Sequence, residues 1–353
     1  MRFQSYEHGG NIYDYNRKLI DFSSNINPLG PPSWIEEIIT RVDLSVYPDI
    51  RYRKLRSSIA GYLGCSPESV IVGNGITELI FLFVRAFKVK RPLIPSPTFC
   101  EYERAVILHG GKPKFLKIRE EENFKLNVYE VIEKIPLVDA LFLCNPNNPT
   151  GGIINKRELS LIVDAAKSLD IPVFVDEAFI EFVMDEKNYT AIDLIEKYDK
   201  LFVVRAITKF FALPGLRLGY GIAQATTINR LESYKEPWSV NSIAVEVGSR
   251  IFEDKKYIEE SKIKVNELRE NFMKALSHVN FLKVFPSSTN FILVKLLKDT
   301  SSEIKNRLLD RGFLIRDASN FRYLNKKFIR LAVRGEKENV LIVGAIRDIL
   351  GGG

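Results

Sequence analysis

The chain has 353 residues, of which 46% are hydrophobic and 27% are charged, a composition typical of a globular protein with a core large enough for two domains. Its formal net charge is +7, but Lys and Arg are interleaved with Asp and Glu along the chain, so we expect no nucleic-acid partner. The chain lacks an apolar run of membrane-spanning length and an N-terminal signal segment, so we expect a cytoplasmic protein without a membrane partner.

The cysteines and histidines predict neither a disulfide framework nor a metal site. Cys65, Cys100 and Cys144 are odd in number and lack paired spacing, which favours reduced thiols. The histidines at positions 8, 109 and 278 are far apart, and no group of residues has the spacing of metal ligands. We therefore expect no metal.

Short apolar runs alternate with helical segments through the middle of the chain. The predicted strands are Leu93–Pro95, Ala140–Cys144, Ile171–Val175, Leu201–Val204 and Gly219–Ala223, the last as an edge or antiparallel strand. Apolar helices are expected at Leu79–Ala86 and Asn155–Ser168. Runs that are apolar on both faces and joined by helices predict a mainly parallel sheet covered by helices on both sides.

The pattern changes after Pro237 and Trp238. The expected elements are a long helix at Asp254–His278, a strand at Asn290–Val294, a helix at Ser302–Arg311, a strand at Phe328–Val333 and a last helix from Glu336. We interpret this part as a smaller α+β domain that the N-terminal residues join. The predicted division is a large domain at residues 37–242 and a small domain made of residues 1–36 and 243–353.

Three polar segments follow predicted strands and indicate one shared site. The turn Asn145–Gly151 follows one strand, Asp176 ends the next, and Lys209 lies a few residues beyond a third. Ligands of parallel sheets bind beyond the carboxyl ends of the strands. An amine, a carboxylate and a polar turn at that edge favour an aldehyde cofactor that the amine holds and the carboxylate tunes.

These motifs, in this order, resemble those of the fold-type I pyridoxal-phosphate enzymes of the aspartate aminotransferase superfamily, over nearly the whole chain. The resemblance implies an α/β transferase fold with a smaller α+β domain, and pyridoxal 5′-phosphate as the cofactor. It also implies that Lys209 binds the cofactor aldehyde and moves protons, and that Asp176 pairs with the pyridine nitrogen. Asn148 would donate to the ring hydroxyl oxygen, and Tyr102 would stack on the ring.

The cofactor phosphate is expected at the glycine-containing turn that leads into Leu79–Ala86. Such a turn presents free backbone N–H groups to an anion. By the resemblance, the phosphate contacts are assigned to Gly75, Ile76, Thr77, Thr208 and Arg217. Tyr47 matches a tyrosine that reaches the phosphate in the neighbouring subunit, which implies a homodimer with shared sites.

Two positions depart from the aminotransferase pattern. Phe179 stands where many aminotransferases place a tyrosine that bonds the ring oxygen. Ala206 stands where a Ser or Thr commonly contacts the phosphate. Neither departure removes an essential group, and Phe179 fits a decarboxylase subgroup.

Within the superfamily the chain is similar to histidinol-phosphate aminotransferases, and closer to the threonine-phosphate decarboxylases of cobalamin biosynthesis. The closer likeness lies in four segments, His8–Asn11, Asp21–Gly30, Pro237–Asn241 and Ile315–Arg322. The resemblance implies that Arg330 grips the substrate carboxylate, with Asn148 and Asn290 nearby. We expect a substrate phosphate to be surrounded by His8, Asn27, Arg316 and Arg322.

The expected reaction is decarboxylation of O-phospho-L-threonine to (R)-1-amino-2-propanol O-phosphate for cobalamin biosynthesis. The alternative is an aminotransferase that acts on histidinol phosphate or an aromatic amino acid with 2-oxoglutarate. The two reactions differ in which Cα bond stands perpendicular to the cofactor ring, and a small change in substrate anchoring decides between them. A non-catalytic cofactor-binding regulator is disfavoured, because Lys209 is present and no DNA-binding domain is appended.

Overall fold

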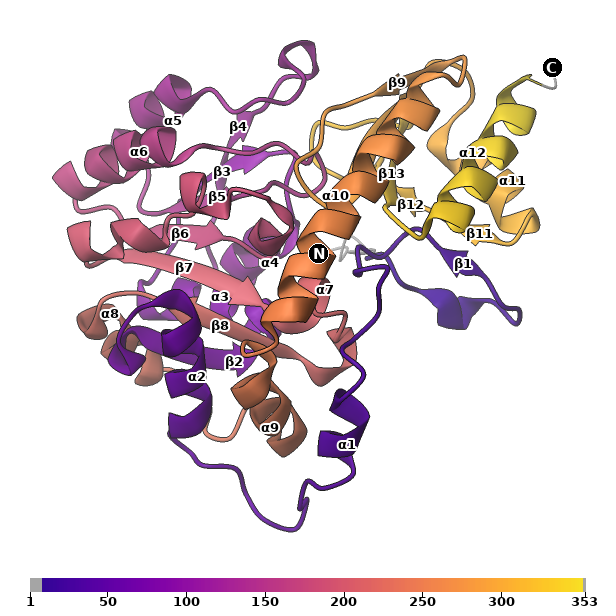
Figure 1. The fold of residues 1–353 in the computed structure, drawn as a ribbon. Coiled ribbons are helices and arrows are strands. Elements are labelled where there is room, and N and C mark those ends of the chain that lie inside the picture. The colour runs from indigo at the N-terminus through magenta and orange to yellow at the C-terminus, as the bar shows by residue number, and fades with distance from the viewer. Residues whose placement is uncertain (1–7, 352–353) are drawn as a thin grey trace.

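A seven-stranded sheet lies at the centre of the structure, a computed structural model that describes residues 8–351 (Figure 1). In spatial order its strands are β2 (Val70–Asn74), β8 (Leu218–Ile222), β7 (Leu201–Ala206), β6 (Val173–Asp176), β5 (Leu141–Cys144), β3 (Leu93–Ser96) and β4 (Lys114–Lys117). β8 runs antiparallel to both of its neighbours, and the other neighbouring pairs are parallel. The mainly parallel sheet is confirmed, and the strand predicted at Gly219–Ala223 is antiparallel and lies inside the sheet.

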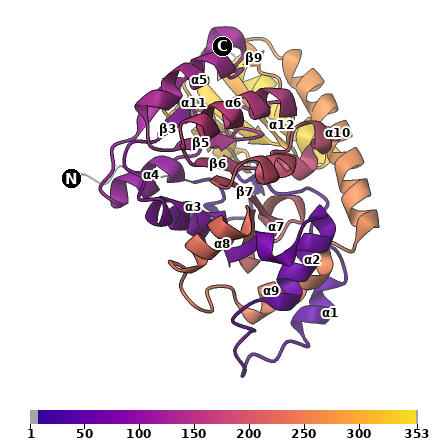
Figure 2. The same ribbon diagram turned by 90° about the vertical axis from the view of Figure 1, so that its left-hand side faces the viewer.

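Successive side chains of the central strands enter two different apolar cores. In β6, Val173 and Val175 join one core and Phe174 joins the other, as the two-residue period of a strand requires. The first core is covered by α2 (Arg53–Leu63), α5 (Val128–Lys134), α6 (Lys156–Ser168) and α9 (Ser242–Ile251). The second is covered by α3 (Gly75–Ala86), α4 (Glu101–Leu108) and α8 (Ala225–Glu232) (Figure 2). Both faces of the sheet are therefore buried.

Helix α6 shows how the local sequence sets a boundary. The side chain of Asn155 accepts a hydrogen bond from the backbone N–H of Glu158, and the Glu158 side chain accepts one from the backbone N–H of Asn155. This capping box satisfies two backbone donors at the start of the helix. The apolar residues Leu159, Ile162, Val163 and Ala166 then recur on one face and are buried.

A second, four-stranded antiparallel sheet forms the smaller part of the molecule. Its order is β12 (Arg316–Asp317), β13 (Phe328–Ala332), β10 (Phe291–Leu296) and β9 (Leu282–Val284). Helices α10 (Lys255–Ser277), α11 (Ser301–Asp310) and α12 (Glu336–Gly351) share its apolar core. The N-terminal strand β1 (Ile20–Asp21) pairs in parallel with β11 (Phe313–Leu314). The predicted domain limits at residues 36/37 and 242/243 stay a prediction.

The site is positioned by strand ends that lie side by side. Cys144 of β5 is opposite Asp176 of β6, which is itself opposite Val204 of β7. The short helix α7 (Ile207–Phe210) follows β7 directly and carries Lys209. A further short helix, α1 (Ile35–Ile39), lies in the segment that joins the N-terminal strand to α2. The predicted convergence of the three polar segments at one edge of the sheet therefore holds.

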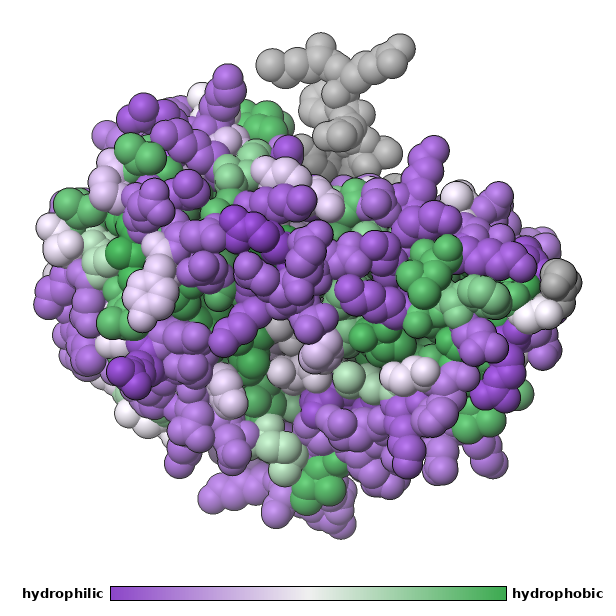
Figure 3. All heavy atoms as spheres, turned by 90° about the horizontal axis from the view of Figure 1, so that it is seen from above, coloured by the Kyte–Doolittle hydropathy of each residue, from purple (hydrophilic) through white to green (hydrophobic). Residues whose placement is uncertain are grey.

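The outer surface mixes polar and apolar side chains. Figure 3 shows hydrophilic residues over most of one face, with smaller groups of apolar residues between them. Opposite charges are paired across elements, for example Lys54 with Glu246 and Arg85 with Glu236. Within residues 8–351, no helix combines the length and the apolar content that crossing a membrane requires.

Candidate active site

A cavity of about 240 Å³ opens at the carboxyl ends of β5, β6 and β7. It is lined by residues from both sheets and from the N-terminal segment. The predicted site residues in its wall are His8, Ile76, Thr77, Tyr102, Asn148, Asp176, Thr208, Lys209, Arg217, Arg316 and Arg330. Phe179 and Ala206, the two positions that depart from the aminotransferase pattern, line it as well. The structure thus brings together residues that are up to 322 positions apart in the sequence, from His8 to Arg330.

Lys209 presents an amine to this cavity from the first turn after β7. Burial lowers its pKa from 10.5 to about 8, and the positive charges of Arg330 and Arg217 add to that effect. A neutral amine is the nucleophile that attacks a carbonyl group. The lowered pKa therefore increases the fraction of Lys209 that can react with an aldehyde near neutral pH.

Asp176 is a buried carboxylate with a partner on each oxygen. Its Oδ2 accepts a hydrogen bond from the Tyr102 hydroxyl at 2.7 Å, and its Oδ1 accepts one from the Ala178 N–H at 2.9 Å. Burial raises its pKa from 3.8 to about 6, and these two hydrogen bonds reduce the rise. A cationic ring nitrogen placed against the carboxylate would lower that pKa again. The environment of Asp176 therefore fits a protonated pyridine.

The start of α3 and Arg217 form an anion cradle. Gly75 has a φ of +74°, and a Cβ on it would lie 2.3 Å from Arg217 Nη2, so only glycine lets the guanidinium approach the helix this closely. A Cβ on Gly219 would lie 2.6 Å from the Ile76 nitrogen. The N-terminal N–H groups of a twelve-residue helix and a guanidinium suit a phosphate. The hydroxyl residues Thr77 and Thr208 line the same cavity.

Arg330 is a buried guanidinium that reaches across from the small sheet. Nη1 donates to Asn148 Oδ1 at 2.6 Å and Nη2 donates to the Ser23 carbonyl at 2.7 Å. Its Nε has no hydrogen-bond partner among residues 8–351. Burial lowers its pKa to about 9, with the charge of Arg316 adding to the effect. A buried cation with an unpaired donor is suited to an incoming carboxylate.

Arg316 is held at another part of the wall by its own loop. Its Nη1 donates to the Asp317 carbonyl and its Nη2 to Asn320 Oδ1, each at 2.7 Å. Its guanidinium lies 5.2 Å from the centre of the Phe321 ring, which also lines the cavity. The cavity therefore has two separate guanidinium groups from the small sheet, Arg330 and Arg316.

Two predicted site residues are buried beside the cavity without lining it. Asn27 donates to the Phe210 carbonyl at 2.8 Å and to Ser261 Oγ at 3.0 Å, so its amide ties α7 to α10. Asn290 is fully buried, and its Nδ2 has no hydrogen-bond partner among the described residues. Their proposed contacts with substrate stay predictions.

Two others lie on the surface. Tyr47 is 79% exposed, and its ring centre is 4.8 Å from that of Trp238. This exposure suits a residue whose expected ligand belongs to a neighbouring subunit. Arg322 pairs with Glu103 at 2.5 Å and lies 3.7 Å from the centre of the Phe115 ring, outside the cavity wall.

Several wall residues were not among the residues predicted from the sequence. They are Gly9, Ser23, Ser24, Asn25, Phe99, Cys100, Cys144, Ala178 and Phe321. Asn25 is buried, and its Oδ1 has no hydrogen-bond partner within residues 8–351. It lies two residues before Asn27, so the Asn-Ile-Asn segment could have indicated Asn25 as a site residue. Phe99 lies 5.7 Å from Tyr102 between ring centres and is a second aromatic wall residue beside Asp176.

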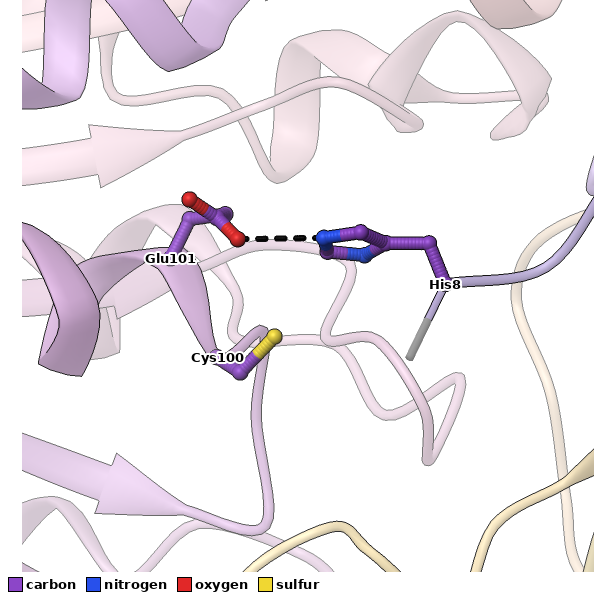
Figure 4. A group of neighbouring side chains, drawn as sticks. All are labelled: His8, Cys100 and Glu101. Carbon is purple, nitrogen blue, oxygen red and sulfur yellow. Dashed lines mark hydrogen bonds and ion pairs between the residues drawn. The ribbon is translucent and has the colours of Figure 1, made fainter. Parts of the chain in front are cut away.

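One group of donor atoms in the described part of the chain has a spacing that suits a metal. Ligand atoms of His8, Cys100 and Glu101 lie within 4.8 Å of one another (Figure 4). The spacing of these residues in the sequence gave no sign of this proximity. Glu101 also accepts from Arg104 Nη1 at 3.1 Å, so its carboxylate already has two partners, Arg104 and His8. The absence of a metal stays a prediction.

Comparison with known proteins relates this geometry to one family. The family model described as aminotransferase class I and II matches residues 17–344. A protein of Caldanaerobacter subterraneus subsp. tengcongensis, provisionally named threonine-phosphate decarboxylase, is 55% identical over 99% of this chain and 95% of its own. The threonine-phosphate decarboxylase of Salmonella typhimurium is 33% identical over 98% of this chain and 97% of its own.

A solved structure extends the likeness to three dimensions. The histidinol-phosphate aminotransferase from Clostridium acetobutylicum has a TM-score of 0.89 and 35% identity to this chain. The match covers 95% of this chain and 100% of that one. The predicted fold class is confirmed by these matches.

Proposed function

Because the chain belongs to the aminotransferase class I and II family, we propose that it is a pyridoxal-5′-phosphate-dependent decarboxylase of O-phospho-L-threonine. The product would be (R)-1-amino-2-propanol O-phosphate, the linker unit for cobalamin biosynthesis. The single observation that carries the proposal is the presence of two guanidinium groups, Arg330 and Arg316, in one cavity with Lys209. A phosphorylated amino acid has two anionic ends and an amino group, which matches this arrangement.

The residues present fit the cofactor. The Gly75 turn and Arg217 suit its phosphate, Asp176 suits its pyridine nitrogen, and Asn148 supplies an amide near the ring oxygen. Lys209 would hold its aldehyde carbon through Nζ. When bound, the cofactor supplies an electron sink for the bond that breaks at the substrate Cα.

The chain's own groups would then orient the substrate and manage the proton. Arg330 would hold the carboxylate, and Arg316 with His8 would hold the phosphate, so that the Cα–carboxylate bond stands upright on the ring. Cleavage of the Cα–carboxylate bond would release carbon dioxide and leave Cα in need of a proton. Lys209 would then deliver a proton to Cα in place of the lost carboxylate.

The wall residue Asn25 is a better candidate for the substrate phosphate region than Asn27. Asn25 lines the cavity, whereas the Asn27 amide does not line it and already donates to the Phe210 carbonyl and to Ser261 Oγ. At equal cofactor content, Asn25→Ala would then weaken binding of the phosphorylated substrate more than Asn27→Ala does. Arg322, which is bonded to Glu103, would have a minor part.

We further propose a homodimer in which Tyr47 reaches the partner's cofactor phosphate. The support is a run of exposed apolar side chains around it, Leu44, Val46 and Ile50. Such a run on the surface suits burial against a second copy. Sedimentation velocity would give the mass of a dimer, and Tyr47→Ala would lower cofactor affinity. A monomer with full cofactor affinity would refute this arrangement.

The purified holoenzyme tests the reaction directly. It is incubated with O-phospho-L-threonine in the absence of any 2-oxo acid, and carbon dioxide and the amine product are measured. Equal amounts of carbon dioxide and aminopropanol phosphate would support the decarboxylase. If the holoenzyme instead released no carbon dioxide and transferred the amino group of histidinol phosphate to 2-oxoglutarate, the proposal would be replaced by the aminotransferase.

A further inference from the structure

Two glutamates of α4 pair with nitrogen-bearing side chains, one at the cavity wall and one outside it. Glu101 Oε1 lies 3.1 Å from His8 Nε2, and Glu103 Oε1 lies 2.5 Å from Arg322 Nη2. Positions two apart on a helix point in different directions, so the two pairs do not share a face. His8 and its neighbour Cys100 line the cavity, whereas Arg322 lies outside it. The first pair therefore faces the substrate region, and the second provides a natural control.

Glu101 is the buried partner and His8 the exposed one. The Glu101 side chain is 3% exposed and the His8 side chain is 48% exposed. Burial acts to raise the pKa of Glu101, but the hydrogen bond with His8 and the charge of Arg104 outweigh it, and the pKa is lowered. Figure 4 shows the His8 imidazole and the Glu101 carboxylate pointing toward each other, with Cys100 beside them. The buried Glu101 carboxylate is thus an anchor for the more exposed His8 ring.

The N-terminal segment fixes His8 from its other side. A Cβ on Gly9 would lie 2.0 Å from the Ser23 carbonyl oxygen, so the segment packs on Ser23 more closely than any side chain allows. The Gly10 N–H donates to Ser23 Oγ at 2.7 Å. The same Ser23 carbonyl accepts from Arg330 Nη2. The position of His8 is therefore tied to that of the guanidinium proposed to hold the carboxylate.

We infer that Glu101 is a positioning residue that acts through His8 and selects substrates with a phosphate. The inference rests on the proposed function, because it assigns His8 to the phosphate end of that substrate. The hydrogen bond between the Glu101 carboxylate and His8 Nε2 fixes the orientation of the ring toward the cavity. Glu101 itself is buried behind His8 and does not line the cavity. Glutamine in its place would keep an acceptor oxygen but lose the negative charge, so the hydrogen bond that holds the His8 ring would be weaker.

Binding of the amine product and its unphosphorylated analogue tests this inference without turnover. The holoenzymes of the wild type, Glu101→Gln and Glu103→Gln are titrated by calorimetry with 1-amino-2-propanol O-phosphate and with 1-amino-2-propanol. Glu101→Gln differs from the wild type by the loss of one charge-assisted hydrogen bond. It should therefore bind the phosphorylated amine about tenfold more weakly than the wild type, and the unphosphorylated amine equally well. Glu103→Gln should bind both like the wild type. Equal weakening of both amines by Glu101→Gln, or no weakening, would overturn the inference.

A double-mutant cycle separates positioning from a structural effect. The single variant His8→Ala should weaken binding of the phosphorylated amine. The double variant with Glu101→Gln should bind this amine no more weakly than His8→Ala does, because the carboxylate acts only through the ring. Glu101→Asp should recover part of the affinity. If the losses of binding free energy from His8→Ala and from the Glu101 variant were additive, the inference would be overturned. Glu101→Asp replaces Glu101→Gln in the cycle if Glu101→Gln folds poorly. These binding results hold whether or not carbon dioxide is released, so failure of the proposed reaction remains distinguishable.

Discussion

Asn148 and Arg330 are hydrogen-bonded across the cavity, with Arg330 Nη1 donating to Asn148 Oδ1 at 2.6 Å. Asn148 comes from the turn after β5 and Arg330 from β13, so this bond joins the two sheets at the site. It also joins the residue expected at the cofactor ring to the residue expected at the substrate carboxylate. A change at either one should therefore affect both ligands.

Arg330→Lys is the sharpest change at this contact. An ammonium group cannot reproduce the two-pronged bonding of Arg330 to Asn148 and the Ser23 carbonyl while gripping a carboxylate. We expect KM for O-phospho-L-threonine to rise at least about tenfold, since a hydrogen bond to a charged group is worth roughly 1.5–3 kcal/mol. Arg334→Lys, four residues on, is the control and should leave KM unchanged. Equal KM values for Arg330→Lys and the wild type would refute the carboxylate grip.

Asp176 should make the stability of the apoprotein depend on pH. The pKa of Asp176 in the folded protein, about 6, lies above its ordinary value of 3.8. Its contribution to the free energy of unfolding is therefore complete below about pH 4 and is lost as the pH rises through about 6. Asp176→Asn removes this loss, and the variant apoprotein should be more stable than the wild type at pH 8 by up to about 3 kcal/mol. Urea unfolding of both apoproteins at pH 4 and pH 8 measures the difference. A variant less stable at pH 8 would contradict the raised pKa.

Much of the site was predictable because it lies where the local pattern is strongest. Buried strands give apolar runs, and a polar residue that ends such a run, as Asp176 does, is visible in the sequence. The start of α3 was less visible, since the apolar pattern begins at Leu79 whereas the helix begins at Gly75. The first turn of a helix is selected for backbone donors and close approach rather than for apolar spacing.

Contacts between distant segments could not be read from the pattern. His8 and Glu101 are separated by 93 positions, and neither position carries a signal of the other. The choice between Asn25 and Asn27 depends on which side chain the segment turns toward α10, and that is set by Tyr257 and Ser261. Tertiary packing therefore decides which of several similar polar residues reaches the cavity.

Covalent loading of the cofactor should accelerate with pH. The amine of Lys209 must be neutral to attack an aldehyde, and with a pKa of about 8 only about one-tenth of it is neutral at pH 7. The rate of pyridoxal 5′-phosphate attachment to the apoprotein should rise between about pH 7 and pH 8 and level off above about pH 9. Stopped-flow absorbance follows the attachment, with Lys209→Ala as the unreactive control. A rate that keeps rising toward pH 10.5 would indicate an amine with an ordinary pKa.

Gly75→Ala should weaken the cofactor phosphate site. The residue has a positive φ, and an added Cβ would meet the Arg217 guanidinium at 2.3 Å, so Arg217 must move away from the helix start. Backbone strain of this kind costs about 1–3 kcal/mol, which corresponds to at least about a fivefold loss of cofactor affinity. Equilibrium dialysis with pyridoxal 5′-phosphate measures this loss of affinity. Gly61→Ala, a helical glycine of α2 with open space around its Cβ, should bind the cofactor normally.

Arg316 and Arg322 should differ sharply although both come from the same predicted phosphate segment. Arg316 lines the cavity beside Phe321, whereas Arg322 stacks on Phe115 and pairs with Glu103 outside the wall. Arg316→Ala should therefore raise KM for O-phospho-L-threonine by at least about tenfold while changing any turnover of L-threonine much less. Arg322→Ala should change KM by less than about twofold, because an exposed ion pair contributes little.

Steady-state kinetics with the two amino acids, on variants of equal cofactor content, separates these outcomes. A selective loss for the phosphorylated substrate in Arg316→Ala would place the phosphate on the cavity side of the segment, because of these two arginines only Arg316 lines the cavity that Lys209 lines. If Arg322→Ala showed the selective loss instead, the phosphate would have to bind on the outer side, where Phe115 and Glu103 lie. In that case the phosphate would lie outside the cavity that Lys209 lines, and the proposed assignment of Arg316 would be wrong.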